Sequence, residues 1–214
     1  MSITILLADD HRITREGVKL MLNEQPDFQV IGETGDGRDA VELAASLSPD
    51  VIVMDLTMPT LNGVEATRQV KAQRPEVKVI VLSMHLERQF VSATLSAGAS
   101  GYLLKDSPPE DLGRAIRTVV AGEPYLSPKI QEVLVASCLA GSKNNRGYEN
   151  LSPREREVLQ LTAEGKNTKE IALLLHLSSK TVEGHRRQLM AKLDLNGVAD
   201  LTRFAIREGI ALLG

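Results

Sequence analysis

Five polar residues that could carry out phosphoryl chemistry each follow closely on an apolar stretch of this sequence. They are two adjacent acids, one further acid, a hydroxyl and an amine: Asp9, Asp10, Asp55, Ser83 and Lys105. Three carboxylates in one place repel one another unless a cation lies among them, and an all-oxygen cluster suits Mg²⁺. With the metal and the Lys105 ammonium neutralising the transferred oxygens, Asp55 could attack a phosphoryl donor and become an acyl phosphate.

The apolar stretches before these residues have the pattern of strands in an α/β domain. Five β-rich runs alternate with five helical patterns, in which apolar residues recur at spacings of three and four. The predicted strands are Ser2–Ala8, Gln29–Glu33, Val51–Met54, Val77–Leu82 and Gly101–Leu104, and the predicted helices are Thr14–Glu24, Asp39–Leu47, Gly63–Arg74, Glu87–Ala97 and Asp111–Ala121. This alternation predicts a flavodoxin-like, doubly wound, five-stranded parallel sheet with helices on both faces. The functional crevice of such a sheet lies beyond the carboxyl ends of its strands.

Each candidate residue taken alone has a simpler explanation than catalysis. Asp9 and Asp10 could cap the following helix, Ser83 could be a turn hydroxyl and Lys105 a solvated charge. Together they form a specific pattern, because four independent strand ends deliver complementary groups to the same edge of one sheet. We therefore predict a phosphoryl site there.

The composition is that of a soluble globular protein with two modest domains. The chain has 214 residues, 43% of them apolar and 25% charged, and lacks an apolar run long enough to span a membrane. Nothing at the N-terminus indicates export, and the single cysteine, Cys138, suits a reducing compartment, so we expect a cytoplasmic protein. Residues 1–125 hold 12 basic and 18 acidic side chains, whereas residues 126–214 hold 13 and 10. This asymmetry favours a metal or phosphate device joined to a nucleic-acid binder.

The pattern changes after the predicted sheet, and residues 123–149 are predicted to be a linker. Its first part, Pro128–Leu139, could form an amphipathic helix, and residues 141–150 consist of small and polar residues that have little to bury. That composition predicts a mobile connection between a domain at residues 1–122 and another at residues 150–214.

The C-terminal domain is predicted to have four helices, and capping motifs in the sequence mark where helices begin. Capping boxes begin at Ser152 and Asn167, and Ser178 caps a longer helix that runs to Leu193. A short helix at 168–175, a turn at His176–Leu177 and this longer helix have the spacing of a helix-turn-helix. On the longer helix Val182, Leu189 and Leu193 can face a core, while Lys180, Glu183, Gly184 and Arg187 share another face. Glycine inside a helix is unfavourable, and close approach to another backbone or to DNA is one reason to accept it.

Residues 1 to about 122 resemble the receiver domain of bacterial two-component response regulators. The resemblance rests on the acidic pair, the loop from Asp55 to Pro59 with the Asn62–Gly63 that follows it, Ser83, and Tyr102 three residues before Lys105. It implies that Asp55 is the phosphoacceptor and that Mg²⁺ is held by Asp10, Asp55 and the backbone carbonyl of Thr57, with Asp9 acting through metal-bound water. It also implies that Ser83 and Lys105 hold the phosphoryl group and that Tyr102 is an aromatic switch. Two residues depart from the commonest receiver pattern: Asp106 in place of proline, and Met84 in place of a small residue.

The C-terminal domain resembles the LuxR-type helix-turn-helix, and the whole chain resembles response regulators of the NarL/FixJ subfamily. The matching strings are Leu151–Leu159, Glu170–Ala172, Thr181–Arg186 and Lys192–Leu193. By this resemblance Glu183, Gly184 and Arg187 face base edges, and the residues nearer phosphates are Lys180, Thr181, Arg186 and Lys192. His185 is interpreted as structural. The last helix, Val198–Glu208, is expected to present Leu201, Ala205 and, one turn on, Glu208 and Gly209 beyond the DNA face. The resemblance implies that this helix pairs across a homodimer.

These features together predict a phosphorylation-controlled transcriptional regulator rather than an enzyme. Its expected partners are a sensor histidine kinase, promoter double-stranded DNA and a second copy of the chain, with RNA polymerase a candidate further partner and no membrane. One alternative is an aspartyl-phosphate hydrolase of the haloacid-dehalogenase type, but Thr57 stands where that family has a second acid. Another is a DNA-binding protein whose receiver-like half accepts no phosphate, which the complete set of acidic and basic site residues disfavours.

Overall fold

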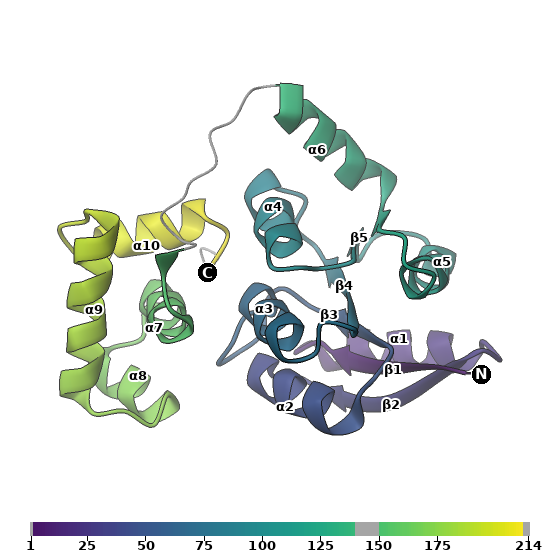
Figure 1. Cartoon of the computed structure of the whole chain (residues 1–214), viewed down its shortest axis with the longest axis horizontal. Helices are drawn as coiled ribbons and strands as arrows, with labels where there is room; N and C mark the ends of the chain where they lie inside the picture. Colours follow the sequence, from purple (N-terminus) through teal and green to yellow (C-terminus); the bar gives the residue numbers. More distant parts are fainter. Residues whose placement is uncertain (1, 140–149, 212–214) are drawn as a thin grey trace. The chain divides into compact units, whose positions relative to one another are not determined.

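The computed structural model describes residues 2–139 and 150–211, and these divide into two compact units with separate cores. The first unit extends to Gly141 and the second begins at Ser142. Of the predicted linker, the polar segment at residues 141–150 lies outside the described residues, apart from Asn150. Each unit is described by itself below (Figure 1).

The first unit is built on a parallel sheet in which every strand pairs in the same direction. Its strands, in the spatial order β2-β1-β3-β4-β5-β6, are β1 (Ile3–Ala8), β2 (Phe28–Thr34), β3 (Val51–Met54), β4 (Lys78–Ser83), β5 (Gly101–Leu104) and β6 (Tyr125–Leu126). Chain order and spatial order reverse between β1 and β3, as expected for a doubly wound fold. The prediction of five strands is corrected by β6, whose two residues pair with Gly101 and Tyr102 of β5. A two-residue strand has no periodicity that the sequence pattern could reveal.

Helices cover both faces of this sheet (Figure 1). They are α1 (Arg12–Asn23), α2 (Gly37–Leu47), α3 (Gly63–Gln73), α4 (Arg88–Ser96) and α5 (Pro109–Val120). One core joins Ile5 and Leu7 of β1 to Leu22 of α1 and Ile116 of α5, while α3 packs between α2 and α4. All four residues of β3 are buried, because a central strand has helices on both sides.

Part of the range 123–149 that was predicted to be linker is attached to the first unit. After β6, helix α6 (Pro128–Leu139) buries Ile130 completely and packs against α4. Lys129 near its start forms an ion pair with Asp106, Nζ to Oδ2 2.8 Å, in the loop after β5. The first part of the predicted linker, through α6, therefore belongs to the first unit at the edge of its sheet.

The second unit consists of α7 (Pro153–Ala163), α8 (Thr168–Leu174), α9 (Ser179–Leu193) and α10 (Val198–Arg207). Both predicted capping boxes are present, at Ser152 and at Asn167, and Ser178 caps α9 by accepting from the Thr181 amide. The turn before α9 places His176 in the left-handed region, with φ of 53°. The predicted helix-turn-helix is thus confirmed, and its recognition helix stands on a core that includes Val182 and Leu189.

Two further features concern the described residues only. No helix among them is long and apolar enough to cross a membrane. All of their peptide bonds are trans, so the bond between Lys105 and Asp106 is trans as well.

Candidate functional site

The predicted site residues of the first unit meet at the carboxyl edge of the sheet. Asp9 follows β1, Asp55 follows β3, Ser83 ends β4 and Lys105 follows β5. The Lys105 ammonium lies between two carboxylates, with Nζ 2.7 Å from Asp9 Oδ2 and 2.9 Å from Asp55 Oδ2. These three side chains come from three different strands, so the order of strands in the sheet is what brings them together.

Asp55 is held firmly despite the cost of burying a carboxylate. Its amide donates to the Ala8 carbonyl across β1 and β3 at 2.7 Å, and its Oδ1 accepts from the Leu56 amide at 2.7 Å. The start of α3 presses on the same loop, because a Cβ added at Gly63 would lie 2.0 Å from the Asp55 carbonyl oxygen. Burial raises the pKa of Asp55, and the hydrogen bond from Lys105 opposes that rise without cancelling it.

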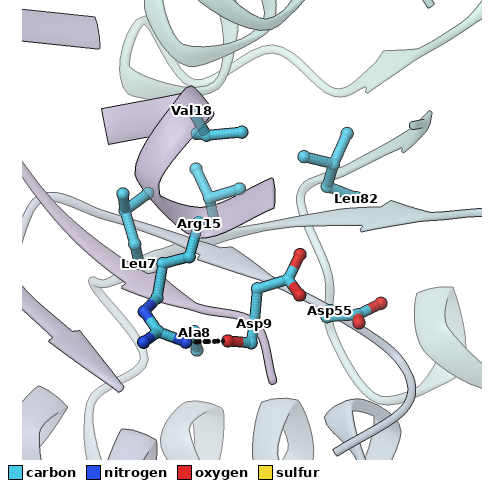
Figure 2. Close-up of a pocket in the computed structure, with 8 residues that line it drawn as sticks. Leu7, Ala8, Asp9, Arg15, Val18, Asp55 and Leu82 are labelled. Carbon is cyan, nitrogen blue, oxygen red and sulfur yellow. Dashed lines mark hydrogen bonds between the residues drawn. The ribbon is translucent and has the colours of Figure 1, made fainter. Parts of the chain in front are cut away.

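Lys105 remains a cation because its partners outweigh its burial. Burial alone would lower the pKa of the ammonium, but the hydrogen bonds and charges of Asp9 and Asp55 raise it above the ordinary value. A second cationic side chain stabilises the segment that carries Asp9, because the Nη1 of Arg15 in α1 donates to the Asp9 carbonyl at 2.5 Å (Figure 2). The site thus has a fixed positive charge next to the candidate nucleophile.

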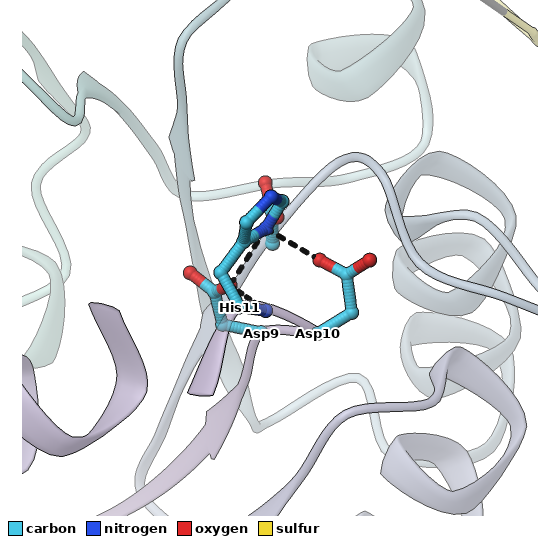
Figure 3. Close-up of side chains that lie close together, drawn as sticks. Asp9, Asp10 and His11 are labelled. Carbon is cyan, nitrogen blue, oxygen red and sulfur yellow. Dashed lines mark hydrogen bonds and ion pairs between the residues drawn. The ribbon is translucent and has the colours of Figure 1, made fainter. Parts of the chain in front are cut away.

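The acidic residues also converge on a fourth residue that the sequence analysis did not single out. Figure 3 shows the His11 ring beside Asp9 and Asp10, and its Nδ1 lies 2.7 Å from Asp10 Oδ1. One potential ligand atom from each of Asp9, Asp10, His11 and Asp55 lies within 4.8 Å of the others. Three carboxylates this close fit a hard cation such as Mg²⁺. The only sequence signal for His11 is its position directly after the acidic pair.

Ser83 and Tyr102, the candidate switch residues, are both completely buried. Ser83 Oγ accepts from the His85 amide at 3.1 Å, and the Tyr102 hydroxyl donates to the His85 carbonyl at 2.6 Å. Burial raises the pKa of Tyr102, so the ring carries its proton. The loop after β4 therefore connects the hydroxyl to the aromatic ring, while Met84 between them points its side chain largely into solvent.

The predicted DNA-contacting residues of α9 divide into two groups. Lys180, Thr181, Glu183 and Arg187 are exposed, and a Cβ added at Gly184 would meet no described atom within 4 Å. No packing within the described residues explains this glycine. An approach from outside the chain remains a reason for it.

The second group, Arg186 and Lys192, makes contacts inside the unit. Arg186 donates to the Thr162 and Thr168 hydroxyls at 3.1 and 3.0 Å and to the Lys166 carbonyl at 3.0 Å, and burial lowers its pKa. Lys192 pairs with Glu155, Nζ to Oε2 2.8 Å. Both side chains thus join α9 to other parts of the helix-turn-helix, and their phosphate contacts stay predictions.

The expected dimer face of α10 is corrected by the structure. Leu201 and Ala205 are 0% exposed and belong to the core of their own unit, so neither is available to a second copy. Both residues are buried in the core because α10 packs along α7. The accessible side of α10 instead carries Val198, Thr202 and Ile206, spaced four residues apart.

Response regulators are the class of protein that combines a receiver sheet with an acidic edge and a separate helix-turn-helix. The chain matches the response regulator receiver domain over residues 5–117 and the bacterial regulatory proteins of the luxR family over residues 149–205, and it belongs to this class. It is 41% identical over 204 residues to the transcriptional regulatory protein LiaR of Bacillus subtilis (strain 168), which covers 95% of each chain. It is 38% identical over 208 residues to the nitrate/nitrite response regulator protein NarL of Escherichia coli (strain K12), covering 97% of this chain and 96% of the relative.

A solved structure of similar architecture is that of RcsB from Salmonella enterica serovar Typhimurium bound to promoter rprA. The TM-score is 0.61 at 28% identity, and the match covers 95% of this chain and 98% of RcsB. The chain is therefore a response regulator of the NarL/FixJ subfamily and a DNA-binding transcriptional regulator, not an enzyme. Family membership sets aside the haloacid-dehalogenase alternative.

Proposed function

We propose that this response regulator is phosphorylated on Asp55 by a sensor histidine kinase and then binds promoter DNA as a dimer. The observation that carries the proposal is the position of Lys105, whose ammonium lies 2.9 Å from the Asp55 carboxylate and 2.7 Å from that of Asp9. A fixed cation beside a buried carboxylate suits transfer of an anionic group, because positioning and charge neutralisation dominate phosphoryl transfer.

In the proposed transfer, an oxygen of Asp55 forms a bond to phosphorus while the bond to the donor's leaving group breaks. Lys105 would turn its ammonium to the transferred oxygens, and the Ser83 hydroxyl would donate to one of them. Asp10, Asp55 and the Thr57 carbonyl would hold Mg²⁺, with Asp9 acting through metal-bound water; the metal would neutralise charge on the phosphoryl group. The cluster of three carboxylates supports this assignment of ligands.

The surface beside Lys105 supports docking of a protein phosphodonor. A cavity of about 280 Å³ opens between α1 and the loop before α5, and its lining includes Val18, Lys105 and Pro108. The same helix, α1, also exposes the apolar side chains of Ile13 and Leu20. Apolar patches of this kind mark interaction sites. Leu20→Ser should therefore slow phosphorylation by a purified kinase while leaving the reaction with acetyl phosphate unchanged.

Hydrogen bonds in the first unit offer a route for the signal from Ser83 to α6. The amide of Ser127 donates to the Tyr102 carbonyl at 3.1 Å, and this bond joins the segment after β6 to β5, the strand that carries Tyr102. Lys129 pairs with Asp106, the neighbour of Lys105. A shift of Ser83 and Tyr102 toward a phosphoryl group would thus pull on the start of α6. We propose that this movement of α6 then permits the second unit to bind DNA as a dimer.

The proposed dimer would read two half-sites about one helical turn apart, because one recognition helix alone offers little buried area. Glu183, Gly184 and Arg187 would face the bases, with Lys180 and Thr181 nearer phosphates. The accessible side of α10, with Val198, Thr202 and Ile206, would meet its counterpart in the second copy. Such a regulator would work in the cytoplasm, where the chromosome and RNA polymerase are found.

One experiment tests the chemistry and its consequence together. Incubation with acetyl phosphate should add one base-labile phosphoryl group only when Mg²⁺ is present, and Asp55→Asn should remove it, because an amide is a poor nucleophile. Footprinting and sedimentation of the same samples should show a dimer on paired half-sites only after labelling. Retained labelling of Asp55→Asn would place the phosphoryl group elsewhere, and a phosphorylated monomer on DNA would refute the dimer.

A further inference from the structure

The His11 imidazole lies in the middle of the acidic cluster, although its ring comes from the edge of the site. Its Nδ1 is 2.7 Å from Asp10 Oδ1, 3.5 Å from Asp9 Oδ1 and 3.8 Å from Asp55 Oδ2. One nitrogen therefore approaches an oxygen of each of the three acids, and Figure 3 shows the ring beside Asp9 and Asp10. A cation that is shared by these carboxylates would draw on oxygen atoms that this nitrogen approaches.

The acids are contacted from two sides in this arrangement. Lys105 binds the Oδ2 atoms of Asp9 and Asp55, and the Nδ1 of His11 approaches the side of the cluster that Asp10 completes. The short contact of His11 is the one to Asp10, the most exposed of the three acids. His11 thus makes its short contact with Asp10, the acid to which Lys105 is not bonded.

Imidazole and metal compete for the same carboxylate oxygen. Mg²⁺ prefers oxygen ligands, and the Asp10 Oδ1 that could ligate it is the atom that the His11 Nδ1 approaches to 2.7 Å. The ring is free to leave, since its side chain is 64% exposed. Departure would also spare α1, because His11 is the N-cap residue of that helix but makes no side-chain capping hydrogen bond.

We propose that His11 is a gate on the metal site, occupying the place of Mg²⁺ and turning into solvent when the metal enters. The proposal rests on the proposed Mg²⁺ site and adds a residue that controls its affinity. His11 is a positioning residue in this account, since it orients Asp10 and touches neither the donor nor the transferred group. The gate makes metal binding weaker than the carboxylates alone would allow.

Calorimetric titration of the full chain with Mg²⁺, at one fixed pH, tests the gate. His11→Ala should lower the Kd for Mg²⁺ by about 3- to 10-fold, the size expected for removing a partly exposed hydrogen bond to a carboxylate. Arg12→Ala is the matched control, because Arg12 is exposed, also basic, and has no described contact with the cluster. His11→Gln, which retains an N–H donor, should fall between His11→Ala and the unchanged chain.

A second measurement follows the ring itself. In ¹⁵N spectra of histidine side chains, saturating Mg²⁺ should move the His11 Nδ1 signal to that of a solvated imidazole. A Kd that is unchanged or raised in His11→Ala, or a Nδ1 signal that Mg²⁺ does not move, would overturn the gate. Failure of the proposed metal site looks different: the unchanged chain would then bind no Mg²⁺, or Asp10→Asn would bind it as well as the unchanged chain.

Discussion

The two units of this protein bury charged side chains for opposite purposes. In the first unit Asp9, Asp55 and Lys105 lie against one another at the edge of the sheet, where Lys105 also lines a cavity. In the second unit Glu155 and Arg186 form their contacts between helices of the same unit. The buried charges of the receiver are thus available for a reaction, and those of the helix-turn-helix hold a platform together.

This difference teaches how recognition and chemistry make different demands on basic residues. In the proposed transfer Lys105 exchanges its carboxylate partners for a phosphoryl group, so its contacts have to be replaceable. Arg186 makes three hydrogen bonds that fix α9 to its neighbours, which leaves Arg187, the next residue, exposed on the rigid helix. The bonds of Arg186 thus hold the helix on which the exposed Arg187 stands, and the predicted base readout by Arg187 depends on that fixed position.

The largest expected effect comes from removing the cation of the reactive site. Lys105→Gln should slow labelling by acetyl phosphate by about 100-fold, the loss typical of one preorganised charge-stabilising group. The initial rate of phosphoryl incorporation measures it, with Lys19→Gln, a lysine outside the site, as the control. A normal rate in Lys105→Gln together with lowered stability would mean that this charge is structural too, which would erase the contrast between the units.

The neighbouring arginines of α9 offer the sharpest internal comparison. Arg186→Ala should lower the free energy of unfolding of the second unit by about 2 kcal/mol, because it removes three hydrogen bonds from a half-buried ionic donor. Arg187→Ala should leave that free energy within about 0.5 kcal/mol and instead relax preference at one base pair by about 1 to 3 kcal/mol. Thermal unfolding and binding to specific and random DNA measure both. Equal losses on the two DNAs for Arg187→Ala would remove it from base readout.

Much of the receiver could be predicted from the sequence because its site lies at the ends of strands. Asp55 and Lys105 follow apolar runs whose length and composition mark them as buried strands, and parallel pairing then brings the ends together. The capping boxes at Ser152 and Asn167 were equally accessible, since each depends on residues only three positions apart.

What could not be predicted depends on contacts between elements distant in the sequence. Arg186 and Arg187 look alike in a string of letters, and only the placement of α7 and α8 turns the first inward. Leu201 was assigned to the outside for the same reason, because a four-residue spacing does not say which face of a helix meets the core. The contacts of His11 with Asp55 required the fold of the loop after β1.

The pair between Lys192 and Glu155 should show itself as a pH dependence. Burial raises the pKa of Glu155, but hydrogen bonds from Lys192 and Ser152 outweigh it and hold the pKa below the ordinary 4.5. A lowered pKa in the folded state adds stability above pH 4.5 and loses it as the pH falls through the folded value. Lys192→Met should therefore cost about 1 kcal/mol at pH 7, discounted because the lysine is partly exposed, and should flatten the loss in acid.

Unfolding of the full chain between pH 3 and 7, followed through the transition of the second unit, measures this slope. Lys180→Met is the control, since Lys180 is exposed on the face predicted to meet DNA. It should keep the stability and slope of the unchanged chain while lowering the dependence of DNA affinity on salt by about one charge. An unchanged acid slope in Lys192→Met would show that the other hydrogen bonds of Glu155 suffice.

The smallest expected effect, at Gly184, separates recognition from stability most directly. A Cβ at this position meets no described atom within 4 Å, so Gly184→Ala should be accepted without strain. Alanine also restricts the unfolded chain and favours the helix, which should raise the free energy of unfolding by about 0.5 kcal/mol.

The same methyl group should weaken binding if α9 lies close against DNA at this residue. Titration of operator and random duplexes, alongside thermal unfolding, should then show a more stable protein that binds less well. Ala191→Gly, an exposed position on the same helix, is the reverse control and should lower stability without the matching gain in affinity. Gly184→Ala that is both more stable and equally able to bind would mean that no external surface approaches this part of α9, and the glycine would need another explanation.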